Sequence, residues 1–371
     1  MNKMKTEIFA KRIKNLRELG RKAGINAFLI TTKENMRYFI NLSVLSIERF
    51  AAVIIPVDKG GPVVIVPKLE EEKARKQTAI NDVRSYSDSE NPAILLKKVI
   101  GDFNLEKAVF GVEAALSFKF YKMLLDVSPS IRAEDASAFL GQLRSIKSDE
   151  EIRTMKKAAD IVAAGIRAGI EFIKPGVSEL AISSKIEQTI KEHGGENVPF
   201  CIVLSGKNTA LPHGETSLRK VSAKDVVLMD VGAVYNGYYA DLTRTVFVGG
   251  ATEEQREIYR VVAEAQEAAI KAVKPNIRAE EIDYVARKII GDAGYGEYFT
   301  HRTGHGLGLE VHEEPYIVQG NKTILKPGMT FTIEPGIYLP GKFGVRIEDN
   351  LAVTEKAFRL LSNLEKEMLI I

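Results

Sequence analysis

The second half of the chain repeats one order of features after about 100 residues, and this repeat restricts the possible fold more than any other feature. In each copy a helix-forming stretch leads to a lysine-proline turn, at residues 174–177 and again at residues 274–277. A second helical stretch follows and ends in a glycine-containing turn, at residues 194–196 or 294–297. We therefore expect two α/β halves of similar topology, related by a pseudo-twofold axis.

Each copy of the repeat also contains an apolar strand that closes with an acidic residue, any residue and then glycine. A further acidic residue follows later in each copy. If the two halves face each other, these four carboxylates meet at a shared centre. They are Asp230 and Asp241 in the first copy, and Glu334 and Glu348 in the second.

The first two carboxylates flank a strong hairpin signal, the pair Asn236-Gly237. A two-residue turn at this pair would set Asp230 opposite Thr243. Asp241 would then lie opposite Gly232. Asp230 and Asp241 would therefore be diagonal neighbours on one face of the ladder, within ~7–8 Å at the backbone. Two such carboxylates among apolar strands need a cation beside them, which can be a lysine, an arginine or a metal ion.

Histidine is rare in this chain, yet three of the five histidines lie between residues 301 and 312: His301, His305 and His312. Alternate glycines interrupt that segment, so it is neither a helical zinc motif nor a dinucleotide-binding loop. A fourth, His213, lies between proline and glycine. Four carboxylates and one imidazole suit two divalent ions such as Mn, Co, Fe or Zn. Mg would keep more waters, and structural zinc would show thiolates.

The first third of the chain alternates strand-like and helix-like stretches, which predicts an α/β domain over residues 1–130. No stretch of it has the spacing of metal ligands or of a catalytic nucleophile, so we interpret it as a scaffold or lid. The predicted helices are residues 8–22 and 93–103, and the predicted strands are 27–31, 50–56, 62–67 and 108–113.

A polar interruption at residues 128–134 marks the expected domain boundary. Beyond it, Ser148 and Glu151 form a capping box that predicts the start of a long amphipathic helix. We therefore expect a second domain over residues 135–371, with its own capping box at Thr252 and Gln255.

Composition excludes several functional classes. The 371 residues include 52 basic and 49 acidic side chains, a net charge of +3 that gives no general attraction to nucleic acid or acidic membranes. The single cysteine, Cys201, excludes an intrachain disulfide, and we interpret it as a buried small hydrophobe rather than a nucleophile. Residues 1–20 lack the apolar core of a signal peptide and no apolar run could span a membrane, so we expect a cytoplasmic protein.

Taken together, the motifs resemble those of the pita-bread metallopeptidases, which comprise Xaa-Pro dipeptidases (prolidases), Xaa-Pro aminopeptidases and methionine aminopeptidases. The resemblance covers residues 144–371. It rests on Pro212-His213-Gly214, Asp230-x-Gly232, Tyr238-x-x-Asp241-Leu-Thr-Arg-Thr245, His301-x-x-Gly304-His305-Gly306-x-Gly308, His312-Glu313, Glu334-Pro335-Gly336 and Arg346-x-Glu348-Asp349.

The resemblance implies a pita-bread fold and a centre with two divalent ions, with Mn or Co expected before Zn or Fe. Asp230 would chelate one ion, and Asp241 and Glu348 would bridge both. His305 and Glu334 would complete the second site. Two ions held in this way can supply a bridging hydroxide near neutral pH, which would attack the peptide carbonyl.

The resemblance also assigns roles around the metals. Glu334 would act as proton shuttle as well as ligand. His213, His301 and His312 would contact the substrate and the intermediate. Arg346 would either orient a substrate carboxylate or brace the ligands.

Several activities share this fold. The additional N-terminal domain is typical of the proline-specific branch and favours a dipeptidase, with an Xaa-Pro aminopeptidase as the alternative. Creatinase-like proteins lack the metal ligands, which are all present here. A non-catalytic binding protein of the same fold would typically have lost some of them. The substrate would be a small peptide with proline after the scissile bond, and a homodimer is the family expectation.

Overall fold

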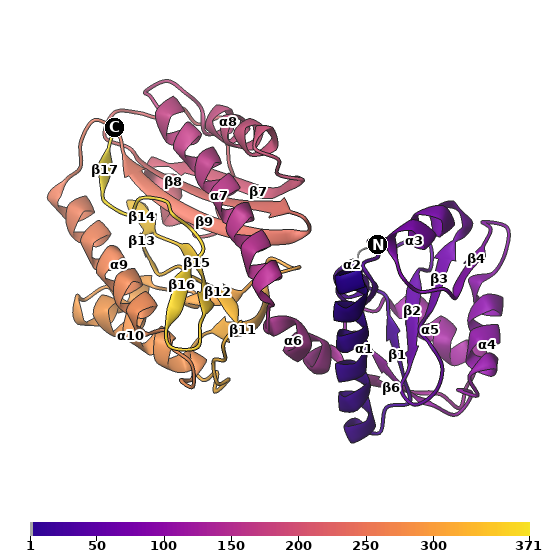
Figure 1. The fold of residues 1–371 in the computed structure, drawn as a ribbon. Coiled ribbons are helices and arrows are strands. Elements are labelled where there is room, and N and C mark those ends of the chain that lie inside the picture. Colours follow the sequence, from indigo (N-terminus) through magenta and orange to yellow (C-terminus); the bar gives the residue numbers. More distant parts are fainter. Residues whose placement is uncertain (1–2) are drawn as a thin grey trace. The chain divides into compact units, whose positions relative to one another are not determined.

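The computed structural model describes residues 3–371 and divides into two compact units, the first ending at Arg144 and the second beginning at Ser145 (Figure 1). Both units combine helices with β-sheet, which confirms the predicted α/β class. Among the helices of the described residues, none has the length and apolar character needed to cross a membrane.

The first unit is built on a mixed six-stranded sheet in the order β4-β3-β2-β1-β5-β6. Each predicted helix and strand of this unit forms within a few residues of its expected bounds. The structure adds short elements that the sequence pattern does not reveal. The unit contains α1 (Lys3–Ala23), β1 (Ala27–Ile30), α2 (Lys33–Ile40), β2 (Ala52–Pro56), β3 (Val63–Pro67), α3 (Glu71–Gln77), β4 (Val83–Tyr86), α4 (Pro92–Asp102), β5 (Val109–Val112), α5 (Phe118–Val127), β6 (Arg132–Asp135) and α6 (Ser137–Ser145).

The first unit extends past the polar interruption at residues 128–134, beyond the expected end at residue 130. The reason is that β6 pairs in parallel with β5, Arg132 beside Val109, and so adds an edge strand to the sheet. Helix α6 follows directly, and the compact units divide near its end.

In the second unit two helix pairs cover two groups of strands. Helices α7 and α8 pack on the sheet β17-β9-β8-β7, and α9 and α10 pack on the strands of the second half. These elements are α7 (Asp149–Phe172), α8 (Glu179–Glu192), β7 (Asn197–Ser205), β8 (Val226–Tyr235), β9 (Tyr238–Phe247), α9 (Glu253–Ala272), α10 (Ala279–Asp292), β10 (Gly304–Gly306), β11 (Glu313–Ile317), β12 (Thr330–Ile333), β13 (Gly336–Leu339), β14 (Phe343–Arg346), β15 (Asp349–Val353), β16 (Phe358–Leu360) and β17 (Leu369–Ile370).

Both predicted capping boxes form. Ser148 and Glu151 begin α7, and Thr252 and Gln255 begin α9, each pair exchanging side-chain and backbone hydrogen bonds. The order of elements in the two halves therefore repeats as the sequence indicates, with a capped long helix, a second helix and then strands.

The β8–β9 hairpin turns at Asn236-Gly237, where both residues have positive φ, 44° and 70°. Asp230 lies opposite Thr243, and Asp241 lies opposite Gly232. This is the register that the two-residue turn predicts, so the two carboxylates do lie on one face of the ladder.

The equivalent hairpin of the second half is interrupted. Its strand pairs continue in one register on both sides of the break, with Ile333 opposite Asp349 and Gly336 opposite Arg346. The interruption falls at Glu334-Pro335, where proline has no N–H to donate to the ladder. This shared register brings Glu334 opposite Glu348, across a short gap in the sheet.

The turn at Gly237 provides a test of the register. We expect Gly237→Ala to lower the stability of the fold by about 1–2 kcal/mol, because a Cβ disfavours the left-handed conformation. Differential scanning calorimetry would show a lower Tm. Gly291→Ala is the matched control, since Gly291 lies in α10 with open space around it. Equal Tm values for the two variants would contradict the strain at the turn.

Candidate metal centre

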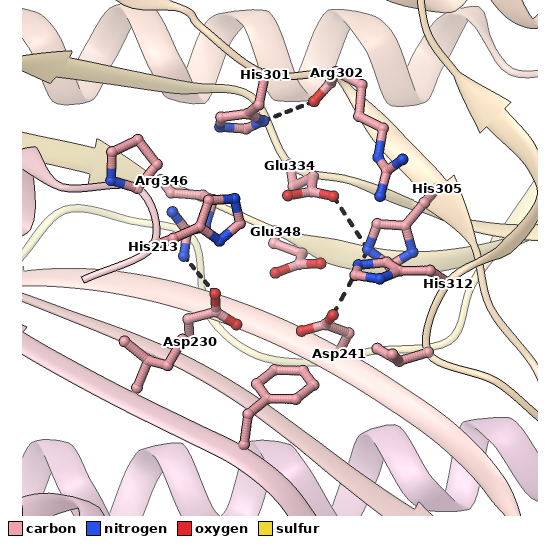
Figure 2. A pocket seen from close by; sticks show the side chains of 14 residues that line it. His213, Asp230, Asp241, His301, Arg302, His305, His312, Glu334, Arg346 and Glu348 are labelled. Carbon is pink, nitrogen blue, oxygen red and sulfur yellow. Dashed lines mark hydrogen bonds and ion pairs between the residues drawn. The ribbon is translucent and has the colours of Figure 1, made fainter. Parts of the chain in front are cut away.

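All nine residues that the sequence suggested for the site line one cavity of about 450 Å³ in the second unit (Figure 2). The strands β8 and β9 provide two of them, and the break between β12 and β13 provides another. The remaining lining comes from β7, β10 and β14 and from the loops next to these strands. The lining residues are Phe200, Ile202, Pro212, His213, Asp230, Asp241, His301, Arg302, His305, Val311, His312, Glu334, Arg346 and Glu348.

Three of the five predicted ligands already have the spacing of a metal site. Asp241, His305 and Glu348 each offer one ligand atom, and these atoms lie within 4.8 Å of one another. All three side chains are buried. Among the described residues, Asp241 Oδ1 and Glu348 Oε1 have no hydrogen-bond partner. A buried carboxylate oxygen without a partner is costly, and a bound cation would satisfy both.

The fourth ligand position, Glu334, lies beside His305. Nδ1 of His305 is 3.0 Å from the carbonyl oxygen of Gly306, so this nitrogen is the donor. Nε2 then carries the lone pair, and it faces Oε1 of Glu334 at 3.3 Å. An oxygen and a nitrogen lone pair at this distance require a proton or a metal ion between them.

The fifth position, Asp230, is paired with an arginine, one of the three kinds of cation that the sequence allows beside these carboxylates. Arg346 donates from Nη2 to Asp230 Oδ2 at 2.5 Å. Arg346 also donates from Nη1 to the Tyr338 hydroxyl and from Nε to the Thr243 hydroxyl. The guanidinium is thus buried in the cavity wall, with each of its three nitrogens donating to a protein group.

Tyr338 continues this chain of contacts to His301. Nδ1 of His301 donates to the Arg302 carbonyl at 2.7 Å, so Nε2 accepts from the Tyr338 hydroxyl at 2.8 Å. This arrangement fixes one tautomer of His301. Tyr338 is not among the residues that the sequence suggested, although its position four residues after Glu334 could have suggested it.

The paired strands of the two halves support the buried carboxylates crosswise. Thr243, two residues after Asp241, donates from its hydroxyl to Glu348 Oε2 at 2.7 Å. Asn350, two residues after Glu348, accepts from the Asp241 backbone N–H at 3.0 Å. Each half therefore holds the carboxylate residue of the other, as a pseudo-twofold arrangement requires.

The other histidines and Arg302 form the more accessible part of the lining. His312 stacks edge-on against His305, with ring centroids 4.2 Å apart, and both His312 and His213 are exposed. Arg302 is half-buried, and its guanidinium lies 4.6 Å from the centroid of the Tyr316 ring. Among the described residues no hydrogen bond or ion pair to this guanidinium is found, so Arg302 is a free cation on the cavity wall.

Comparison with known proteins identifies the family. The model of metallopeptidase family M24 matches residues 153–355, which is more than half of the chain. This protein belongs to metallopeptidase family M24. The model of the creatinase/prolidase N-terminal domain matches residues 12–146 of this M24 protein. Its family is one of metal-dependent peptidases, so the non-catalytic alternative is set aside.

Individual relatives cover nearly the whole M24 chain. An uncharacterized peptidase of Staphylococcus aureus is 39% identical over 342 residues, 92% of this chain and 95% of the relative. The solved prolidase of Thermococcus sibiricus is 41% identical with a TM-score of 0.93, covering 98% and 99% of the two chains. An X-Pro aminopeptidase of Thermotoga maritima is 32% identical with a TM-score of 0.86, covering 97% and 99%. The pita-bread fold expected from the sequence is thereby confirmed.

The electrostatics of this M24 centre favour a bound cation. Burial and the neighbouring carboxylates raise the pKa of Asp241 and of Glu348 well above the usual range. Burial raises the pKa of Glu334 to about 7, a shift that Asp230 reinforces and Arg346 partly opposes. Without a cation these groups retain protons because their charges repel each other in a desolvated site. Divalent ions would take the place of those protons, so the donor set fits the metals that the family implies.

The two inner histidines are neutral. Burial lowers the pKa of His305 to about 3, with His312 adding to the effect, and burial with Arg346 lowers that of His301 to about 3. A neutral imidazole is the form that binds a metal, so His305 is ready to do so through Nε2.

Cys201 differs in part from its prediction, because its side chain on β7 is only half-buried. It still packs beside the core of the first half, and burial raises the pKa of its thiol to about 12. It does not line the cavity, and it has no thiolate character.

The raised carboxyl pKa values predict how the metal-free protein responds to pH. A carboxyl group whose pKa is higher in the folded state stabilises that state below its unfolded pKa. For Glu334 the stabilisation is lost between its ordinary value and about 7. The metal-free protein should therefore be less stable at pH 8 than at pH 5.5. In differential scanning fluorimetry, added MnCl2 should raise Tm more at pH 8.

Asp241→Asn tests the same interaction directly. Removing one buried charge should raise the Tm of the metal-free variant at pH 8 and reduce the response to MnCl2. Asp292→Asn is the control, because Asp292 belongs to an exposed ion pair of α10. The Tm of this variant should respond to MnCl2 as that of the wild type does. A full MnCl2 response in Asp241→Asn would show that no cation binds there.

Proposed function

We propose that this protein hydrolyses Xaa-Pro dipeptides, with two divalent ions held by Asp230, Asp241, His305, Glu334 and Glu348. Mn or Co is the expected metal, with Zn or Fe as the other candidates. When bound, such ions polarise the scissile carbonyl and lower the pKa of a water, so that hydroxide is available near neutral pH. The convergence of all five ligand positions on one cavity supports this proposal.

The position of Arg302 on the cavity wall is the observation that favours a dipeptidase over an aminopeptidase. A dipeptidase must recognise the free carboxylate of proline just beyond the cut, and it needs a cation in the cavity for that purpose. Arg346 is a weaker candidate, because its side chain is only 4% exposed and each of its three nitrogens already donates, to Asp230, Tyr338 and Thr243. Arg302 lines the cavity without an ion-pair partner among the described residues, and we propose that it binds the substrate carboxylate.

The remaining side chains divide the work of hydrolysis. Glu334 takes the proton of the attacking water and passes it to the proline nitrogen as the C–N bond breaks. His213 and His312 are exposed in the cavity and donate hydrogen bonds to the reacting amide and to the developing negative charge. His301 contacts the substrate through its ring, since its two nitrogens are bound to the Arg302 carbonyl and the Tyr338 hydroxyl. Arg346 braces Asp230.

Similarity to proline-specific peptidases is the reason to expect proline after the scissile bond. The similar prolidase and X-Pro aminopeptidase both act at Xaa-Pro bonds by name, and this chain shares with them its full length and its first domain. We extend the proposal to a homodimer in a reducing, cytoplasmic compartment, with the first unit contributing to specificity.

The dipeptidase proposal predicts a substrate pattern. Ala-Pro should be cleaved, and Ala-Pro-Ala should be cleaved far more slowly, in an assay of released alanine with MnCl2 or CoCl2. Losing a charge-assisted contact costs about 1.5–3 kcal/mol, so we expect a difference of roughly 10–100-fold in kcat/KM. Comparable rates for the two peptides would favour the aminopeptidase.

Arg302→Gln separates carboxylate recognition from chemistry. This variant should raise KM for Ala-Pro by roughly 10–100-fold, while cleavage of Ala-Pro-amide, which lacks the carboxylate, should change little. Arg256→Gln on the exposed face of α9 is the matched control. An equal loss on both substrates would remove Arg302 from this role.

Two substitutions test the proton transfers. Glu334→Gln should abolish turnover, and near-normal activity would remove Glu334 from the proton-shuttle role.

His312→Ala should retain the metals, measured by elemental analysis, and lose roughly 10²–10⁴-fold in kcat if it assists acid–base chemistry or stabilises the intermediate. If the metals are lost instead, His312 belongs to the ligand set.

A further inference from the structure

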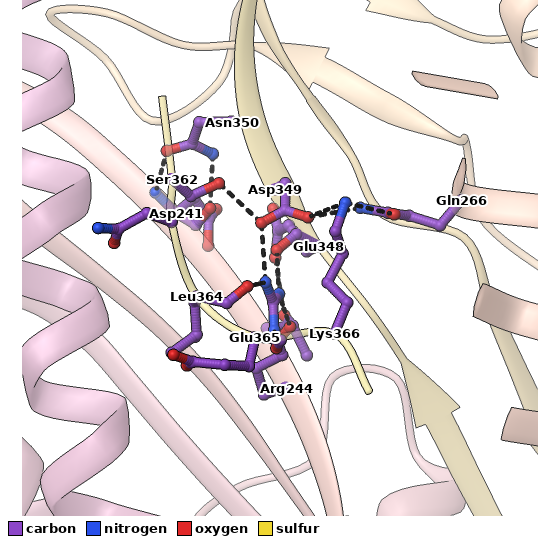
Figure 3. Close-up of polar contacts among 12 residues, drawn as sticks. Asp241, Arg244, Gln266, Glu348, Asp349, Asn350, Ser362, Leu364, Glu365 and Lys366 are labelled. Atoms are coloured by element: carbon purple, nitrogen blue, oxygen red, sulfur yellow. Dashed lines mark hydrogen bonds and ion pairs between the residues drawn. The ribbon is translucent and has the colours of Figure 1, made fainter. Parts of the chain in front are cut away.

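Two charged residues of the sequence motifs, Arg244 and Asp349, do not line the cavity. They form an ion pair of 2.8 Å whose side chains are 3% and 2% exposed (Figure 3). A buried pair of this kind needs many hydrogen bonds to offset the cost of desolvation. The groups that form these hydrogen bonds with Arg244 and Asp349 indicate the role of the ion pair.

Arg244 uses each of its three nitrogens as a donor. Nη1 donates to the backbone carbonyls of Thr243 and Glu348, at 2.8 and 2.7 Å. Nη2 donates to Asp349 and to the Leu364 carbonyl, and Nε donates to the Glu365 carbonyl. One guanidinium therefore joins β9, the start of β15 and the C-terminal segment.

Asp349 is equally well satisfied. Its Oδ1 accepts from Arg244 and from the Ser362 hydroxyl at 2.7 Å. Its Oδ2 accepts from the Gln266 amide of α9 at 2.8 Å and lies 3.2 Å from Nζ of Lys366. Three separate parts of the second unit thus converge on this one carboxylate.

These contacts lie directly next to the candidate ligand Glu348. Asp349 follows Glu348 in the chain, and the Glu348 carbonyl is held by Arg244 itself. Thr243, whose carbonyl Arg244 also holds, donates its hydroxyl to the Glu348 carboxylate. The ion pair therefore fixes the separation of β9 and β15 at the point where Asp241 and Glu348 approach each other.

We propose that Arg244 and Asp349 are positioning residues of the metal centre, and that the C-terminal segment, residues 362–366, is part of its support. The inference rests on the proposed function only in requiring that the cavity holds divalent ions. Contacts outside the ligand set orient the ligands and typically change metal affinity by roughly 10–100-fold when they are lost. A pair with a purely structural role would affect the stability of the fold and leave the affinity of the correctly folded protein unchanged.

The test uses Co²⁺ as the probe, because its absorption spectrum reports the geometry of the ligands. Arg244→Lys keeps the charge, but lysine has three donors instead of five. We expect metal-free Arg244→Lys to bind Co²⁺ roughly 10–100-fold more weakly than the wild type, with an altered visible spectrum. For Ala-Pro, kcat should fall while KM changes little.

Arg167→Lys is the matched control. Arg167 on α7 holds the same C-terminal segment, through Asn363 and Glu365, but it makes none of the contacts to β9 or β15. It should bind Co²⁺ as the wild type does. An equal loss of affinity in both variants would overturn the positioning role of Arg244 and Asp349, because general anchoring of the segment would then account for the effect. Unchanged affinity and spectrum in folded Arg244→Lys would overturn it as well.

A milder variant decides the matter if Arg244→Lys does not fold. Lys366→Met removes one donor to Asp349 at a side chain that is 33% exposed. Weaker Co²⁺ binding supports the proposal, and unchanged binding overturns it. The proposed function fails separately, since a wild-type protein that binds Co²⁺ and does not cleave Ala-Pro would overturn the dipeptidase and leave this inference intact.

Discussion

Mutual repulsion between buried carboxylates is the interaction on which the rest of this structure depends. At an effective dielectric constant of 20, two unit charges 4 Å apart interact by about 4 kcal/mol. Four carboxylates line the cavity, and Arg346 is the buried cation that neutralises one of them. When all four are ionised, three negative charges remain, so one divalent ion would leave this set anionic. Two divalent ions, as proposed, would make it slightly cationic and attractive to an anionic nucleophile.

Hydrogen bonds between the two halves of the second unit help to offset this repulsion. Thr243 and Asn350 occupy equivalent positions, two residues beyond Asp241 and Glu348, and each binds across to the other half. The second copy departs from the first at Pro335, which interrupts the strand where β8 is continuous. The interruption frees Glu334 from a regular ladder and lets it approach His305, whereas Asp230 stays on a strand beside Arg346.

The sequence predicted the parts of the structure that depend on local chemistry. The pair Asn236-Gly237 determines its own turn, so the register of Asp230 against Thr243 could be worked out in advance. The capping boxes similarly predict where α7 and α9 begin. Short elements such as β6 escaped prediction because four residues carry no clear periodicity, and their stability comes from the neighbouring strand.

The sequence predicted which side chains come together in one cavity, but not how they interact. The family motifs identify Arg346 and His301, yet only the fold brings Tyr338 between them. Arg302 gave no signal, because one arginine between two motif residues is indistinguishable in sequence from a solvent-exposed one.

The two arginines of the cavity differ in burial, and this difference underlies the separate roles proposed for them. Arg346 is 4% exposed and each of its three nitrogens already donates to the protein, which favours a role in holding Asp230, Tyr338 and Thr243. Arg302 rests on the Tyr316 ring and can bind an incoming anion without breaking a polar contact found among the described residues. A free cation near an acidic centre would also draw a dipeptide carboxylate to its own part of the cavity wall. In the proposed dipeptidase, the same charge that binds the free C-terminus would therefore also orient the scissile bond towards the metal ligands.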